Sequence, residues 1–132
     1  MIRNYNHYPF MLEIILPGLP RMTNPSGRSG HWRVIKNERD SWIKSVKSVI
    51  GTHKPKTPLK RALLTLVRYS STSPDPDGLV SGFKAIVDGL VRCGVLADDK
   101  FVNIGMPVYL WEKVPRGEGR VRIVVHEIEE EE

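Results

Sequence analysis

The spacing of apolar residues changes along the chain, and each spacing predicts a type of element. Residues 10–16 are mostly apolar and β-compatible, and Pro17, Gly18 and Pro20 end the run sharply. Residues 61–70 form a second, largely apolar run, as in the interior strand of a sheet. The pattern therefore predicts two strands in the first half of the chain.

Helical spacing occurs twice. Asn37 offers an N-cap with Asp40 three positions later, and the apolar stripe that follows predicts a helix over 38–50. A second stripe predicts a helix over 79–90, with the helix-ending Gly94 beyond it. The stripes consist of Trp42, Ile43, Val46, Val49 and Ile50 in the first helix, and Leu79, Phe83, Ile86, Val87 and Leu90 in the second.

Two more strands are predicted over 101–111 and 120–128. They are joined across Pro115 and Gly117, so we expect an antiparallel hairpin. Pro107 cannot donate to a ladder, which puts the first of these strands at a sheet edge or at a bulge. The order strand, helix, strand, helix, strand, strand predicts an α/β (α+β) fold in which two main helices cover a small mixed sheet.

Composition fits one globular domain. The 132 residues are 40% hydrophobic and 27% charged, and no apolar run reaches the roughly 18 residues of a membrane span. The first residues lack the apolar core of a signal peptide, and Cys93 is the only cysteine, which excludes a disulfide framework. We expect a single domain over 1–128 with a solvated acidic tail over 129–132, in an intracellular, cytoplasmic protein without a membrane partner.

The charge balance points to nucleic acid. The formal net charge is +5 even with four glutamates in the tail, and a basic body attracts polyanions. Residues 21–33 read as a basic loop that is either merely solvated or grips phosphates, with Trp32 available to stack on a base. The candidate DNA-binding residues are Arg21, Arg28, His31, Arg33, Lys44 and Lys47.

An acidic turn precedes the second predicted helix. Pro74 and Pro76 hold the residue before each of them extended. Asp75 and Asp77 therefore point the same way and can face one cation. Carboxylate oxygens suit Mg²⁺ or Mn²⁺. The alternative is that Asp77 only caps the following helix.

The remaining charged residues of this segment have two readings each. Lys84 follows Asp77 by seven residues, so on a continuous helix it returns to nearly the same face. It would either hold a phosphate or pair with Asp88 at i,i+4. Asp98 and Asp99 form either an exposed turn or a further part of a cation site. If the helix folds back and brings the two ends of the segment together, these carboxylates form one site.

This combination resembles the RusA family of Holliday junction resolvases. The matching parts are the Asp-x-Asp turn, the helical stretch from Lys84 to Leu90, the pair Gly94-Val95 and the Asp-Asp pair after it. In element order the resemblance covers roughly residues 12–128. It implies a homodimeric, Mg²⁺-dependent endonuclease of bacterial or phage type, in which Mn²⁺ can substitute. Such enzymes cut two strands symmetrically across a four-way DNA junction in recombination and repair.

By position, the resemblance implies that Asp75, Asp77 and Asp99 are catalytic and metal-binding and that Lys84 is an auxiliary catalytic residue. The chain departs from the family at Gly78, where the family has Asn, and at the lysine, which in the family follows the second Asp by four residues. Residues 78–81 are therefore either helix or an enlarged loop.

Other functions remain open at the level of sequence. The chain would alternatively be a non-catalytic module that binds branched DNA, or a nuclease that prefers other branched DNA. No nucleotide cofactor is expected, because the sequence has no Walker or dinucleotide-binding glycine motif.

Overall fold

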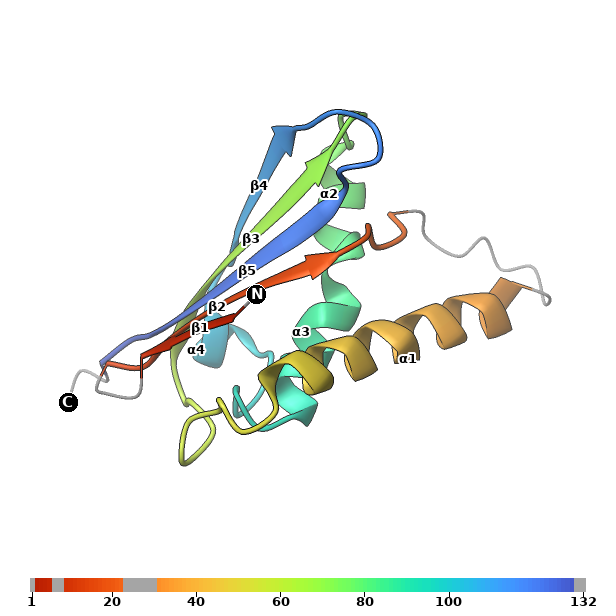
Figure 1. Cartoon of the computed structure of the whole chain (residues 1–132). Helices are drawn as coiled ribbons and strands as arrows, with labels where there is room; N and C mark the ends of the chain where they lie inside the picture. The colour runs from red at the N-terminus through yellow and green to blue at the C-terminus, as the bar shows by residue number, and fades with distance from the viewer. Residues whose placement is uncertain (1, 6–8, 23–30, 130–132) are drawn as a thin grey trace.

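The computed structural model describes residues 2–5, 9–22 and 31–129, and it has the predicted α+β fold. Helices pack against one face of a five-stranded sheet with the strand order β1-β2-β5-β3-β4 (Figure 1). The strands are β1 (Ile2–Tyr5), β2 (Met11–Pro17), β3 (Ala62–Ser70), β4 (Val108–Lys113) and β5 (Arg120–Glu127), and the helices are α1 (His31–Ile50), α2 (Pro76–Gly82), α3 (Lys84–Arg92) and α4 (Phe101–Ile104). Among the described residues, no helix is long and apolar enough to cross a membrane.

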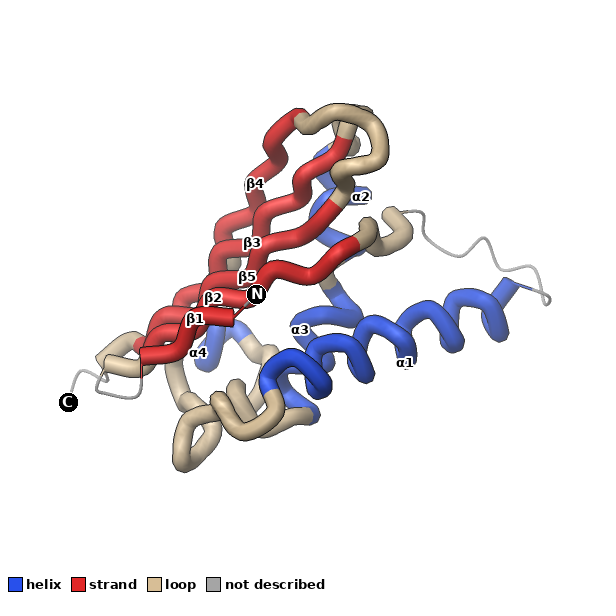
Figure 2. The backbone as a smooth tube through the Cα atoms, viewed as in Figure 1, coloured by secondary structure: helices blue, strands red, loops and turns tan. Residues whose placement is uncertain are grey.

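The sheet is mixed, as expected, but the predicted hairpin of the last two strands is wrong. β5 pairs antiparallel with both β2 and β3, and β4 pairs parallel with the other side of β3 (Figure 2). The apolar side chains Val121, Ile123 and Val125 of β5 are fully buried, which suits a strand flanked on both sides. β4 lies at the sheet edge, in agreement with the prediction from Pro107.

Three element boundaries also differ from prediction. α1 begins at His31 and runs through Asn37, so the predicted N-cap is not a helix start. The predicted strand over 101–111 begins with the short helix α4 instead. The helix predicted over 79–90 is two helices, because Phe83 forms the junction between α2 and α3 with φ −90° and ψ −3°.

The core lies between the sheet and the helices. Phe83 is 1% exposed, and its ring lies 6.1 Å from that of Tyr109 in β4. α3 crosses α1 closely at Gly89, where an added Cβ would lie 3.1 Å from Cβ of Val46. These contacts fix α2 and α3 along the sheet and thereby set the positions of the charged residues that they carry.

Candidate functional site

The two carboxylates of the acidic turn lie at the start of α2. Asp75 occupies the N-cap position in an extended conformation but makes no side-chain hydrogen bond to the helix, and Asp77 lies in the first turn. Both residues are exposed. Within the described residues, neither side chain has a hydrogen bond or an ion pair. Asp77 therefore does not cap the helix, and no residue in the described part of the chain occupies either carboxylate.

Gly78 allows this turn to pack closely. A Cβ on Gly78 would overlap Oδ1 of Asp75 and would lie 3.1 Å from Cβ of Met22. Ser81 donates a hydrogen bond from Oγ to the Met22 carbonyl at 3.0 Å, so the chain after β2 is attached to α2. Residues 78–81 belong to α2, and the enlarged loop considered from the sequence does not form.

The second acidic element lies far from the first. Leu96 forms a β-bridge with Leu59, just before β3, whereas Asp75 follows the other end of β3. β3 has nine residues, so at ~3.3 Å per residue its ends are about 26 Å apart. α2 and α3 run back along this length (Figure 1). Asp99 therefore does not meet Asp75 or Asp77 within one chain.

A three-carboxylate metal site is consequently not formed by a single chain in this conformation. No group of three or more His, Cys, Asp or Glu side chains among the described residues could hold a metal ion. The expectation that the helix brings both ends of the segment together is wrong, because α2 and α3 extend along the sheet. Asp75 and Asp77 keep the right chemistry for Mg²⁺, since this ion binds through one or two carboxylates and waters.

Lys84 lies apart from the acidic turn, in a pocket between α1 and the α2–α3 junction. The pocket has a volume of about 370 Å³, and Asp75 and Asp77 do not line it. Its lining residues are Pro20, Arg21, Ile35, Glu38, Arg39, Trp42, Ser81, Gly82, Lys84 and Ala85. The structure thus groups Lys84 with two arginines.

Asp88 does not pair with Lys84. Its Oδ2 accepts a hydrogen bond from Nη2 of Arg39 in α1 at 2.9 Å. This ion pair joins α3 to α1, so the i,i+4 alternative for Lys84 is not formed. Lys84 is exposed at the first position of α3 and has no ion-pair partner in the part of the chain that is described.

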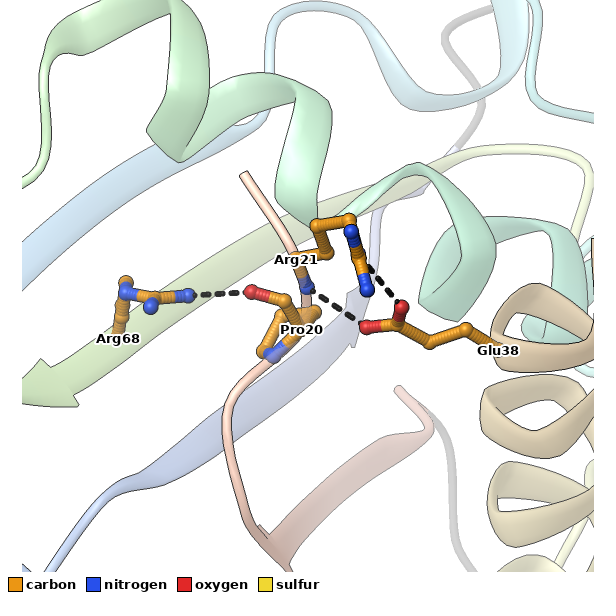
Figure 3. Close-up of polar contacts among 4 residues, drawn as sticks. All are labelled: Pro20, Arg21, Glu38 and Arg68. Atoms are coloured by element: carbon orange, nitrogen blue, oxygen red, sulfur yellow. Dashed lines mark hydrogen bonds and ion pairs between the residues drawn. The ribbon is translucent and has the colours of Figure 1, made fainter. Parts of the chain in front are cut away.

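Arg68 is a residue of this region that sequence reasoning missed. It lies on β3 with 7% exposure, and its Nη1 donates a hydrogen bond to the Pro20 carbonyl at 2.8 Å (Figure 3). Burial lowers the pKa of its guanidinium. Arg21, the residue after Pro20, donates hydrogen bonds to both carboxylate oxygens of Glu38. Its backbone N–H donates at 3.2 Å and its Nε donates at 2.8 Å. Side chains two positions apart in a strand share a face, so Arg68 lies on the same helix-covered face as Leu64 and Leu66. This alternation is the sequence signal that predicts a buried Arg68.

The remaining DNA-binding candidates lie on α1 where they are described. Arg33, Lys44 and Lys47 are exposed, and Lys36 adds a further exposed cation on the same helix face. Arg28 and the side chain of His31 lie outside the described residues. The predicted basic loop over 21–33 is shortened by α1, which begins at His31.

No family model and no curated protein matches this sequence. The resemblance to RusA resolvases therefore rests on the motif residues given above.

Proposed function

We propose that this protein is a Mg²⁺-dependent endonuclease for branched DNA, with the four-way junction as its substrate. The observation that carries the proposal is the pair Asp75 and Asp77. Two exposed carboxylates, two residues apart, flank the start of a helix, and within the described residues they are used neither as caps nor in ion pairs. Such a pair suits a hard cation.

We infer that the third carboxylate comes from a second subunit. Asp99 is about one strand length from Asp75, so a site that contains both needs two chains. Next to Asp99 the chain exposes Phe101, Val102 and Met106 at 72%, 73% and 73%. Large apolar side chains exposed together mark interaction surfaces. In a two-fold dimer that packs this surface beside the acidic turn of the other subunit, Asp99 of the partner subunit would reach each acidic turn.

The chain's own cations would hold the substrate. The exposed face of α1 carries Arg33, Lys36, Lys44 and Lys47, which suit contacts to backbone phosphates. A magnesium ion on the carboxylates would supply an activated water and stabilise the leaving oxygen. Two sites related by a two-fold axis agree with paired cuts in a junction of the same symmetry.

Substitution of Asp77 tests this proposal. Asp77→Asn should abolish Mg²⁺-dependent cleavage of a four-way junction while junction binding is kept. The matched control is Glu118→Gln, which changes an exposed carboxylate between β4 and β5, outside the cationic face of α1, and should cleave as the wild type does. Cleavage by Asp77→Asn at the wild-type rate would contradict the proposal.

One observation favours a second candidate function, a DNA-binding module without nuclease activity. The three carboxylates do not converge within one chain, and the described residues contain no group of three or more His, Cys, Asp or Glu side chains that could hold a metal. This candidate predicts that wild-type protein binds a junction but leaves it uncut at every Mg²⁺ and Mn²⁺ concentration. A panel of flaps, forks and junctions also tests a preference for other branched DNA.

A further inference from the structure

The pocket between α1 and the α2–α3 junction has no role in the proposed metal site. Its volume of about 370 Å³ lies at the lower end of the range of ligand pockets. Ile35 and Trp42 of α1, Ala85 of α3 and Pro20 supply apolar and aromatic lining. The pocket can therefore accept a small group with apolar faces.

The lining is also positively charged. Arg21, Arg39 and Lys84 contribute three cations, and Glu38 is the only carboxylate among the lining residues. Arg21 binds Glu38 through Nε at 2.8 Å, and Arg39 binds Asp88 at 2.9 Å. With Glu38 and Asp88 both counted, the three cations leave an excess of one positive charge, at Lys84. A positive charge beside an apolar wall favours a ligand that combines a planar group with an anion.

Hydrogen bonds hold the pocket in a preformed shape. The Pro20 carbonyl is fixed by the buried Arg68, and Arg21 is fixed to α1 through Glu38 (Figure 3). On the other side, Arg39 ties α1 to α3 through Asp88. The walls therefore need no large rearrangement before a ligand enters, which lowers the entropic cost of binding.

We infer that this pocket binds one unstacked nucleotide of a DNA strand, with the base against Trp42 and the phosphate toward Arg21 and Lys84. Aromatic side chains accept unstacked bases of any sequence, and neighbouring cations hold the backbone. The inference rests on the proposed function and deepens it, since it assigns a place for a base that leaves the stack when the branch point opens. Asp75 and Asp77 do not line the pocket, so the nucleotide held there lies apart from the proposed cleavage site.

The fluorescent base 2-aminopurine tests the inference. We would place it in a short single-stranded oligonucleotide and follow its quenching as it stacks on an indole. Wild-type protein should quench it, and Trp42→Leu should remove most of the quenching and weaken single-strand binding about tenfold. Trp111→Phe is the matched control, because Trp111 lies on β4 and bonds to Ser70, outside the pocket. It should behave as the wild type.

A second variant keeps the test decisive if Trp42→Leu does not fold. Ala85→Leu fills the pocket and keeps the indole, and it should also lose the quenching. Lys84→Gln should reduce the salt dependence of binding by one phosphate contact, a slope change of about 1. Unquenched probe with wild-type protein, or full quenching with Ala85→Leu, overturns the inference. So does displacement of the probe by inorganic phosphate as readily as by deoxyadenosine monophosphate.

Failure of this inference is distinguishable from failure of the proposed function. If the junction is cut with Mg²⁺ while the Ala85→Leu protein quenches as the wild type does, the pocket assignment falls and the nuclease stands. If the pocket quenches the probe through Trp42 but no branched DNA is cut, the nuclease falls and the nucleotide pocket stands.

Discussion

Arg68 and Pro20 are joined by a hydrogen bond of 2.8 Å, from the guanidinium Nη1 to the proline carbonyl. The bond links the interior of β3 to the segment that leaves β2. Nε of Arg68 is buried without a partner among the described residues, so this cation is held at an energetic cost. Arg21, the residue after Pro20, forms an ion pair with Glu38. One buried arginine therefore supports the wall of the cationic pocket.

Arg68→Met should destabilise the fold by about 1–3 kcal/mol. The substitution leaves the buried Pro20 carbonyl without its donor, and an unsatisfied buried acceptor costs this amount. Urea unfolding measures the change as a lower midpoint at an unchanged slope. Arg68→Lys keeps a donor and should recover part of the loss. An unchanged midpoint for Arg68→Met would show that the bond contributes nothing to stability.

Gly89→Ala should destabilise the contact between α1 and α3. The added methyl group would lie 3.1 Å from Cβ of Val46, and overpacking of this kind costs about 1–3 kcal/mol. Gly82→Ala is the matched control, since the nearest atom to its methyl group would be 3.6 Å away. It should stabilise the helix by about 0.4–1 kcal/mol. Equal midpoints for the two variants in urea would contradict the close crossing.

Gly78→Asn introduces the residue that the RusA family has at this position. In this structure its Cβ would overlap the carboxylate of Asp75 and press on Met22. We expect junction cleavage to fall about a hundredfold, because a displacement of about 1 Å near the reacting groups has that effect. Single-turnover cleavage assays measure the change, with thermal melting as the check on folding. Faster cleavage by this variant would argue that the turn is not packed as described.

Mixed dimers test whether the site is shared between subunits. Asp77→Asn and Asp99→Asn should each be inactive alone. In a mixed dimer with shared sites, one site carries both substitutions and the other carries neither. Co-refolded protein should therefore regain nicking at about a quarter of the wild-type number of sites. If the mixture is as inactive as its components, each site lies within one subunit. If Asp99→Asn alone cleaves as the wild type does, Asp99 is not part of the site.

Runs of apolar, β-compatible residues, with turn residues at their ends, predicted β2, β3 and β5, because a strand in a sheet buries at least one face. Leu12, Ile14 and Leu16 are buried while their neighbours face the other side. Strand pairing was not predictable in the same way. The order in which β5 enters between β2 and β3 depends on contacts between residues more than fifty positions apart, and a local turn signal favoured the wrong partner.

In the candidate site too, the sequence predicted local backbone conformation but not which distant residues come together. Local chain stiffness from Pro74 and Pro76 predicted an extended Asp75, and Asp75 is extended with φ −77° and ψ 156°. The extended segment does not continue to Asp77 as expected, because α2 begins at Pro76. The position of Asp99 depends on the path of α2 and α3 along the sheet, which a spacing of residues does not encode. The four residues of α4 are too few for a helical period, so the strand prediction over 101–111 failed there.

Cleavage of a synthetic four-way junction tests the central claim most directly. Wild-type protein is incubated with the junction over a range of Mg²⁺ concentrations, with EDTA and Asp77→Asn as controls. We predict symmetric cuts in two opposite strands that require Mg²⁺ and disappear with Asp77→Asn. A junction that is bound but left uncut at all Mg²⁺ and Mn²⁺ concentrations would contradict the claim.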